Sequence, residues 1–288
     1  MPLRNGPDTA RPGIETLAGC PMGQSLFLSM AAIASLIPAG LAAARRQPGR
    51  DGLFWVLLIV AIAGPLALVA VRTDGVWRAD FSTTLWMTVA ASMIVFGLVA
   101  GFDRQAWRLA PLMAGYLIVV AVLATVWQHA PQKPGTSGQA TTWVAIHIAV
   151  SVATYALVTI AAVAALAAFL QERALKAKRP TALTRALPAV ADCEALLVRL
   201  LILSEIVLGI GLITGMAALY LESGRVLVLD HKTVLTMAAF AVIGGLLFAH
   251  FRTGMRGRKA ARVVLLGYLL LTLGYPGVKF VTDVLLAR

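Results

Sequence analysis

Long apolar runs separated by short polar segments dominate the sequence. Eight runs reach about 20 residues, the length that crosses a bilayer as a helix. They lie near residues 23–44, 53–72, 82–101, 109–128, 141–170, 195–221, 232–250 and 262–281. This pattern predicts an all-α, polytopic integral membrane protein with eight transmembrane helices.

Composition supports the same fold class and narrows the function. Hydrophobic residues make up 59% of the chain and charged residues 13%, about half the charged share of an ordinary soluble domain. The net charge is +12, but the basic residues lie in the loops between apolar runs, so we expect membrane lipid rather than nucleic acid as their partner. Neither Cys20 nor Cys193 belongs to a CxxC pair, and nucleotide-binding and hydrolase motifs are absent from the sequence. We therefore expect no enzymatic activity.

The distribution of Lys and Arg predicts the orientation in the membrane. The loops after the first, third, fifth and seventh runs hold 15 of these residues, and the opposite side holds nine. Because cytoplasmic loops carry the excess, both termini are predicted to be periplasmic, in the inner membrane of a bacterium. Three segments follow: a periplasmic tail at 1–22, helices 1–4 at 23–128 and helices 5–8 at 129–288.

The fifth run carries a candidate binding face. Trp143, His147, Ser151 and Tyr155 recur every four residues and therefore share one side of a helix. Neutral imidazole is a common ligand of heme iron, and aromatic neighbours can pack on a porphyrin. The alternative is that Trp143 anchors the helix at the interface and His147 makes an interhelical hydrogen bond.

The seventh run begins and ends with histidine. Asp230, His231 and Lys232 meet at its predicted start, where Asp230 is a candidate helix cap and Lys232 a candidate partner for a carboxylate. His250 lies at its cytoplasmic end, as either a second ligand position or an interfacial anchor.

The sixth run contains an acidic residue in its middle. Glu205 is expected to be protonated there or paired with a group on another helix, because an isolated charge is costly in hydrocarbon. Gly211 and Gly215 follow in a GxxxG pattern, which predicts close packing against a neighbouring helix.

The order and spacing of these segments resemble one known family. The sequence is similar to the cytochrome c assembly protein family over roughly residues 141–281. The matching segments are Trp143–Ile148 with Ser151 and Tyr155, Gln171–Arg173, Leu208–Gly215, Asp230–Thr233, and Ala249–Arg252 with the basic residues that follow.

The resemblance implies heme chemistry. Members of that family bind heme through histidines on the outer face and present it for attachment to apocytochrome c. The resemblance implies heme b as the cofactor, His147 as an outer ligand, His250 as a transmembrane ligand, and other cytochrome c assembly proteins as partners.

Two departures from the family pattern change the expected role. No Trp lies between Leu221 and His231, where the family has its tryptophan-rich loop, and Gly277–Phe280 replaces the second outer histidine. The chain is therefore similar to the HemX-like branch rather than to the heme ligases. We expect His231 to replace the missing ligand, so that His147 and His231 hold the iron while Trp143 and Lys232 contact the ring and its propionates.

The leading hypothesis is thus a heme-handling inner-membrane protein that assists cytochrome c biogenesis or heme homeostasis. A cofactor-free membrane scaffold that regulates a partner is the first alternative. A small-molecule transporter is the second, although such proteins often have repeated halves, and the two halves of this sequence differ.

The topology can be tested with reporter fusions. Alkaline phosphatase, which is active only in the periplasm, should be active when fused after Arg288 and inactive when fused in the basic segment near Arg179, because these two sites lie on opposite sides in the predicted topology. Activity at Arg179 together with inactivity at Arg288 would reverse the orientation and place His147 and His231 on the cytoplasmic side.

Overall fold

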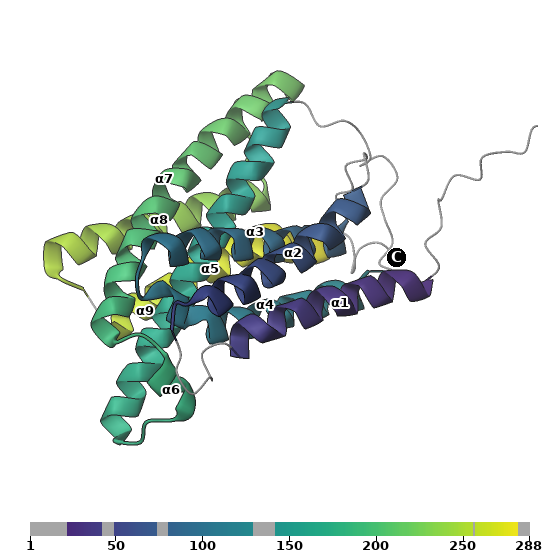
Figure 1. Ribbon diagram of the computed structural model, residues 1–288. Helices are drawn as coiled ribbons and strands as arrows, with labels where there is room; N and C mark the ends of the chain where they lie inside the picture. The colour runs from purple at the N-terminus through teal and green to yellow at the C-terminus, as the bar shows by residue number, and fades with distance from the viewer. Residues whose placement is uncertain (1–21, 42–48, 74–79, 129–141, 256, 282–288) are drawn as a thin grey trace, which may run out of the picture.

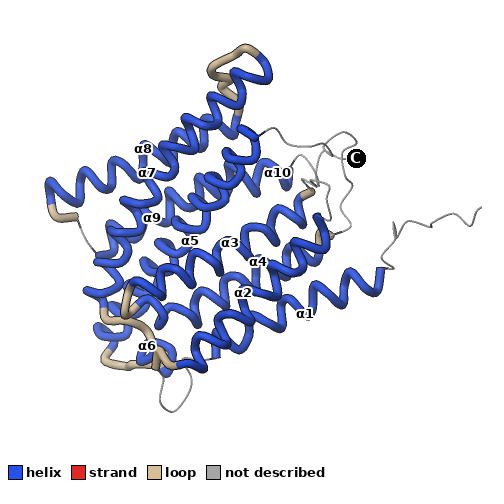
Figure 2. Tube along the Cα trace, turned by 45° about the horizontal axis from the view of Figure 1, so that its top comes forward, coloured by secondary structure: helices blue, strands red, loops and turns tan. Residues whose placement is uncertain are grey.

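The protein is helical throughout the part of the chain that the structure describes. The computed structural model describes residues 22–41, 49–73, 80–128, 142–255 and 257–281, and these contain no strand (Figure 2). The membrane-length helices are α1 (Met22–Leu41), α2 (Gly52–Thr73), α3 (Phe81–Phe102), α4 (Ala110–Val126), α5 (Thr142–Ala177), α7 (Val190–Ser223) and α8 (His231–Thr253). Shorter elements are η2 (Ala106–Leu109), α6 (Ala182–Ala186), α9 (Gly257–Thr272), η3 (Leu273–Gly277) and α10 (Val278–Phe280).

Seven of the described helices are long and apolar enough to cross a membrane. The eighth predicted helix is helical but interrupted. It consists of α9, with 16 residues, followed by the π-helical turn η3 and the short α10. Pro276 lies inside η3 and has no backbone N–H to continue the regular hydrogen-bond ladder, which accounts for the break. The apolar pattern does not reveal this interruption.

Helix α5 is the centre of the bundle. It packs along α7 over a long interface and also contacts α3 and α9, while α1, α2 and α4 form a layer beyond α3 (Figure 1). Its buried residues are mostly alanine and other small side chains, which let neighbouring backbones approach closely. With 36 and 34 residues, α5 and α7 exceed the length that a bilayer requires. Both are longer than the predicted runs at 141–170 and 195–221.

The end of the bundle at which α5 stops and α7 begins carries the basic loops and is called here the basic end. The Gln171 side-chain amide donates to the backbone carbonyls of Thr184 at 2.7 Å, Pro188 at 3.0 Å and Leu187 at 3.2 Å. One side chain on α5 therefore holds the connection that contains α6 in place.

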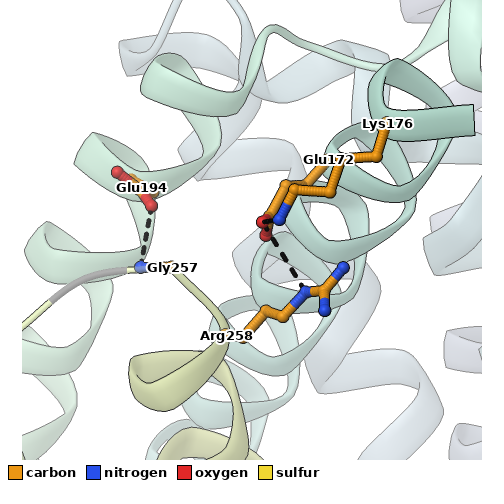
Figure 3. A network of polar contacts seen from close by, with 5 residues as sticks. All are labelled: Glu172, Lys176, Glu194, Gly257 and Arg258. Atoms are coloured by element: carbon orange, nitrogen blue, oxygen red, sulfur yellow. Dashed lines mark hydrogen bonds and ion pairs between the residues drawn. The ribbon is translucent and has the colours of Figure 1, made fainter. Parts of the chain in front are cut away.

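The same end is tied to α9 by charged groups (Figure 3). Glu172 pairs with Lys176 on its own helix and with Arg258 at the start of α9, at 3.6 Å. Glu194 of α7 accepts a hydrogen bond of 3.0 Å from the backbone N–H of Gly257. Gln171 and Glu172 thus join α5 to the α6 connection and to α9, which gives these two residues a structural role.

The first four helices are joined by one guanidinium. Arg72 at the end of α2 donates to Ser82 Oγ at 2.7 Å, Ser29 Oγ at 2.9 Å and Gln128 Oε1 at 3.2 Å. These acceptors belong to the start of α3, to α1 and to the residues just after α4. Charge-assisted hydrogen bonds of this kind are stronger than neutral ones, so Arg72 fixes the relative positions of all four helices at the end opposite the basic end.

Replacing Gln171 by Leu should destabilise the basic end. The substitution keeps the side-chain volume but leaves three carbonyl groups without this donor, at a cost of about 1–3 kcal/mol. We expect a lower melting temperature in detergent, followed by tryptophan fluorescence. Arg173→Gln changes an exposed neighbour and serves as the control. Equal melting temperatures for Gln171→Leu and wild type would mean that the amide contacts contribute nothing.

Candidate functional site

A cavity of about 600 Å³ lies between α5, α7, α8 and η3, at the end of the bundle where α5 and α8 begin. Its volume falls within the usual range for small-molecule and cofactor sites. Most of its wall is apolar, including Leu208, Leu212 and Met216 of α7. Polar groups occur at its mouth, from Asp230 and Lys232, and deeper in the bundle, from Tyr155. Such a cavity suits an apolar ligand with polar groups at its ends.

His147 is half-buried on the cavity wall and is oriented by α7. Its Nδ1 lies 3.1 Å from the carbonyl oxygen of Gly211 and 3.4 Å from Thr214 Oγ1. Because a carbonyl can only accept, Nδ1 carries the hydrogen and donates it to Gly211. This tautomer leaves Nε2 unprotonated and available to a ligand. A donor bond from one ring nitrogen to a backbone carbonyl is the usual support for a metal-binding histidine.

The imidazole of His147 packs against the two glycines of the GxxxG pattern in α7. A Cβ atom added at Gly215 would lie 2.8 Å from His147 Cε1, and Gly211 supplies the carbonyl that orients the ring. A side chain at position 215 would therefore displace the histidine, whereas a Cβ at Gly211 would make only an ordinary contact with Val150 at 3.5 Å. The sequence had linked these glycines only to close helix packing.

Asp230 and Lys232 form the cavity mouth. The backbone N–H of Thr233 donates to Asp230 Oδ1 at 2.8 Å, and this hydrogen bond lowers the pKa of the Asp230 carboxyl. Asp230 is thus the cap of α8, as predicted, and is ionised at neutral pH. Lys232 lines the cavity, whereas His231 is exposed and does not line it. The iron-bridging pair of His147 and His231 stays a prediction.

Two other predicted residues, Trp143 and His250, lie away from the cavity. Trp143 is on α5 near the mouth but is 47% exposed and does not line the wall. His250 is at the opposite end of α8, where its Nδ1–H donates to the carbonyl of Met255 at 2.9 Å. His129 lies outside the described residues. Within the described ranges, no three His, Cys, Asp or Glu side chains gather to hold a metal ion, so His147 is the ligand candidate that the cavity provides.

A cluster of tyrosines reaches the cavity from deeper in the bundle. Tyr155 Oη lies 3.1 Å from Tyr268 Oη and 3.2 Å from Thr272 Oγ1, and Tyr268 is in turn hydrogen-bonded to Tyr116 of α4. The sequence placed Tyr155 on the face of His147 but gave no role to Tyr116 or Tyr268. The sequence did contain a signal for this cluster. Tyrosines within apolar runs need hydrogen-bond partners for their hydroxyl groups when they are buried.

Glu205 lies between α7 and α8 and does not line the cavity. Its Oε2 is buried and has no hydrogen-bond partner among the described residues. A Cβ added at Gly244 of α8 would lie 2.8 Å from Glu205 Oε1, so the carboxyl group packs directly against that glycine. Arg199 instead pairs with Asp103 at 3.3 Å. The described residues therefore do not supply the polar partner expected for Glu205.

Sequence comparisons place the chain among known proteins. The model of the family described as "Cytochrome C assembly protein" matches residues 53–286. The chain belongs to the cytochrome c assembly protein family. The match begins at α2, so the family region is larger than the 141–281 inferred from the motifs and includes helices that the motifs left out. In agreement, Thr88 of α3 lines the cavity and Tyr116 of α4 joins the tyrosine cluster.

Two proteins that are similar to this chain come from bacteria. A protein of Azospirillum brasilense named "Uncharacterized 28.8 kDa protein in nifR3-like 5'region" is 53% identical over 270 residues, covering 92% of this chain and all of the relative. The "Inner membrane protein YpjD" of Escherichia coli K12 is 28% identical over 191 residues, covering 66% of this chain and 70% of the relative. No solved structure matches. Together with the seven apolar helices, these findings identify a multi-pass membrane protein and agree with the predicted inner-membrane location.

Glu205→Gln should leave accumulation in the membrane unchanged, because an amide has nearly the shape of a carboxyl group and fits against Gly244. Gly244→Leu should reduce accumulation, because its side chain collides with Glu205. Immunoblots of isolated membranes measure both. Loss of accumulation for Glu205→Gln would instead identify an essential ionic contact with a group outside the described residues.

Proposed function

We propose that this protein binds heme on its periplasmic side and assists cytochrome c biogenesis, without itself attaching heme to the apoprotein. The observation that carries the proposal is the position of His147. Its Nδ1–H is donated to Gly211, its Nε2 has no hydrogen-bond partner among the described residues, and its ring lines a cavity of about 600 Å³ with largely apolar walls. Family membership supports the same role.

The described residues fit such a cofactor. His147 would bind the iron through Nε2, and Leu212 and Met216 would pack on the apolar ring. Lys232 at the mouth would pair with a propionate, with the exposed Arg225 close by in sequence. Asp230 opposes this attraction with one negative charge. Bound in this way, the heme would supply the redox chemistry of its iron, while the protein would orient the ring and shield it from water.

The loop between α7 and α8 supports the non-ligase role. It contains no tryptophan, and Val226, Leu227 and Val228 line the cavity instead. These aliphatic side chains are 60%, 45% and 37% exposed, respectively, so one surface of the loop faces the cavity and another is available to a partner. We propose that the protein holds heme and passes it to other assembly proteins on that side.

His147→Ala should remove most of the heme that copurifies with the protein, because it deletes the oriented imidazole. The measurement is the Soret absorbance per mole of protein purified from cells supplied with a heme precursor. His129→Ala is the control and should change the heme content little, because His129 belongs to the predicted outer loop and is assigned no role as a ligand.

Gly215→Leu provides an independent test. Its side chain should displace the His147 ring without removing the imidazole, so heme content should fall while the protein still accumulates. Equal heme content in wild type, His147→Ala and Gly215→Leu would overturn the heme site and favour the cofactor-free scaffold.

A further inference from the structure

Four helices surround the cavity in a closed ring of contacts. Helix α5 packs on α7, α7 on α8, α8 on α9, and α9 on α5. In this arrangement α5 and α8 are diagonal to each other, and both line the cavity. A flat ligand in this space therefore has α5 on one side and α8 on the other.

Met237 lies on α8 at about the level of His147 on α5. His147 is five residues after the start of α5 at Thr142, and Met237 is six residues after the start of α8 at His231. Both helices begin at the mouth end, so the two residues lie about 8 and 9 Å from their helix starts by helical rise. Both line the cavity, and Met237 is 44% exposed.

The neighbours of Met237 on α8 indicate the direction of its side chain. Phe240 is three residues later on the same face of the helix, and a Cβ added at Gly209 of α7 would lie 3.5 Å from its ring. Gly244, one further turn along that face, lies against Glu205 of α7. This face of α8 is therefore turned toward α7, and Met237 is its last residue that lines the cavity.

On α7, the contacts with α5 and with α8 lie on different faces. Gly211 and Gly215 contact His147 of α5, whereas Gly209 meets α8, roughly 160° around the helix from Gly211. The residues between these two faces that line the cavity are Leu208, Leu212 and Leu219. A ring whose edge rests on these leucines has His147 at one face and Met237 at the other.

We propose that Met237 Sδ is the second axial ligand of the heme iron, opposite His147 Nε2. Porphyrin iron takes its axial ligands from opposite faces of the ring, and histidine with methionine is an established pair. The flexible methionine side chain allows the sulfur to adjust to the iron. This inference rests on the proposed heme function and gives Met237 the position that the sequence had assigned to His231, which is exposed and does not line the cavity.

The test is the absorption spectrum and the reduction potential of the full-length protein purified with heme. We expect the ferric wild type to be low-spin, with the weak near-infrared band of a sulfur-to-iron charge transfer. Met237→Leu should keep most of the heme, because His147 and Lys232 remain, but should lose this band and become high-spin. Its reduction potential should fall, because methionine ligation raises the potential.

Three further variants separate ligation from packing. Met237→His should restore a low-spin spectrum without the sulfur band, because it supplies an imidazole from the same position, and a purely structural role for Met237 would not produce this result. His231→Ala should keep the band. Met255→Leu changes a methionine beyond the opposite end of α8 and should keep it as well.

The outcomes separate this inference from the function on which it rests. Heme binding without the sulfur band in wild type, or a band that survives in Met237→Leu, would overturn the assignment of Met237 and leave heme binding intact. Loss of the low-spin spectrum in His231→Ala, with no change in Met237→Leu, would overturn it in favour of His147 and His231. Absence of heme from the purified wild type would overturn the proposed function and this inference together.

Discussion

The candidate site depends on the packing of His147 of α5 against Gly211 and Gly215 of α7. The imidazole can donate to Gly211 only if α5 and α7 approach closely at this level, and the ring fits there because Gly215 has no side chain. A polar side chain in an apolar bundle needs a partner, and here that partner also selects the tautomer. The contact of His147 with Gly211 and Gly215 therefore determines both the packing of α5 on α7 and the ring nitrogen that is left for a ligand.

Polar contacts at both ends of the bundle fix the arrangement of the helices around this contact. At the basic end, Gln171 secures the connection that leads into α7, and Glu172 and Glu194 attach the start of α9. At the opposite end, Arg72 joins the first four helices. Neutral packing in a membrane has little hydrophobic driving force between helices, so polar contacts of this kind contribute disproportionately to a defined arrangement.

The cavity combines a mostly apolar wall with polar residues at its mouth, at His147 and deeper in the bundle. Lys232 and Asp230 lie at the mouth, and Tyr155 lies deeper, with hydroxyl partners from α9 and indirectly from α4. The tyrosine chain connects the cavity to the layer of helices that the motifs did not implicate, in agreement with a family match that begins at residue 53. The two halves of the chain thus contribute to one site.

The sequence by itself determined the class of protein, the positions of the apolar helices and the face of α5 that carries His147 and Tyr155, because spans and faces follow from local hydrophobicity and helical period. It did not determine which histidines share a cavity. His231 and Lys232 are adjacent, yet only Lys232 lines the wall, because successive residues point in different directions around a helix. It also missed the break at η3 and the joining of Tyr116, Tyr155 and Tyr268, 152 residues apart at the extremes. Such contacts depend on how helices distant in sequence rotate and pack against one another, which only the tertiary structure decides.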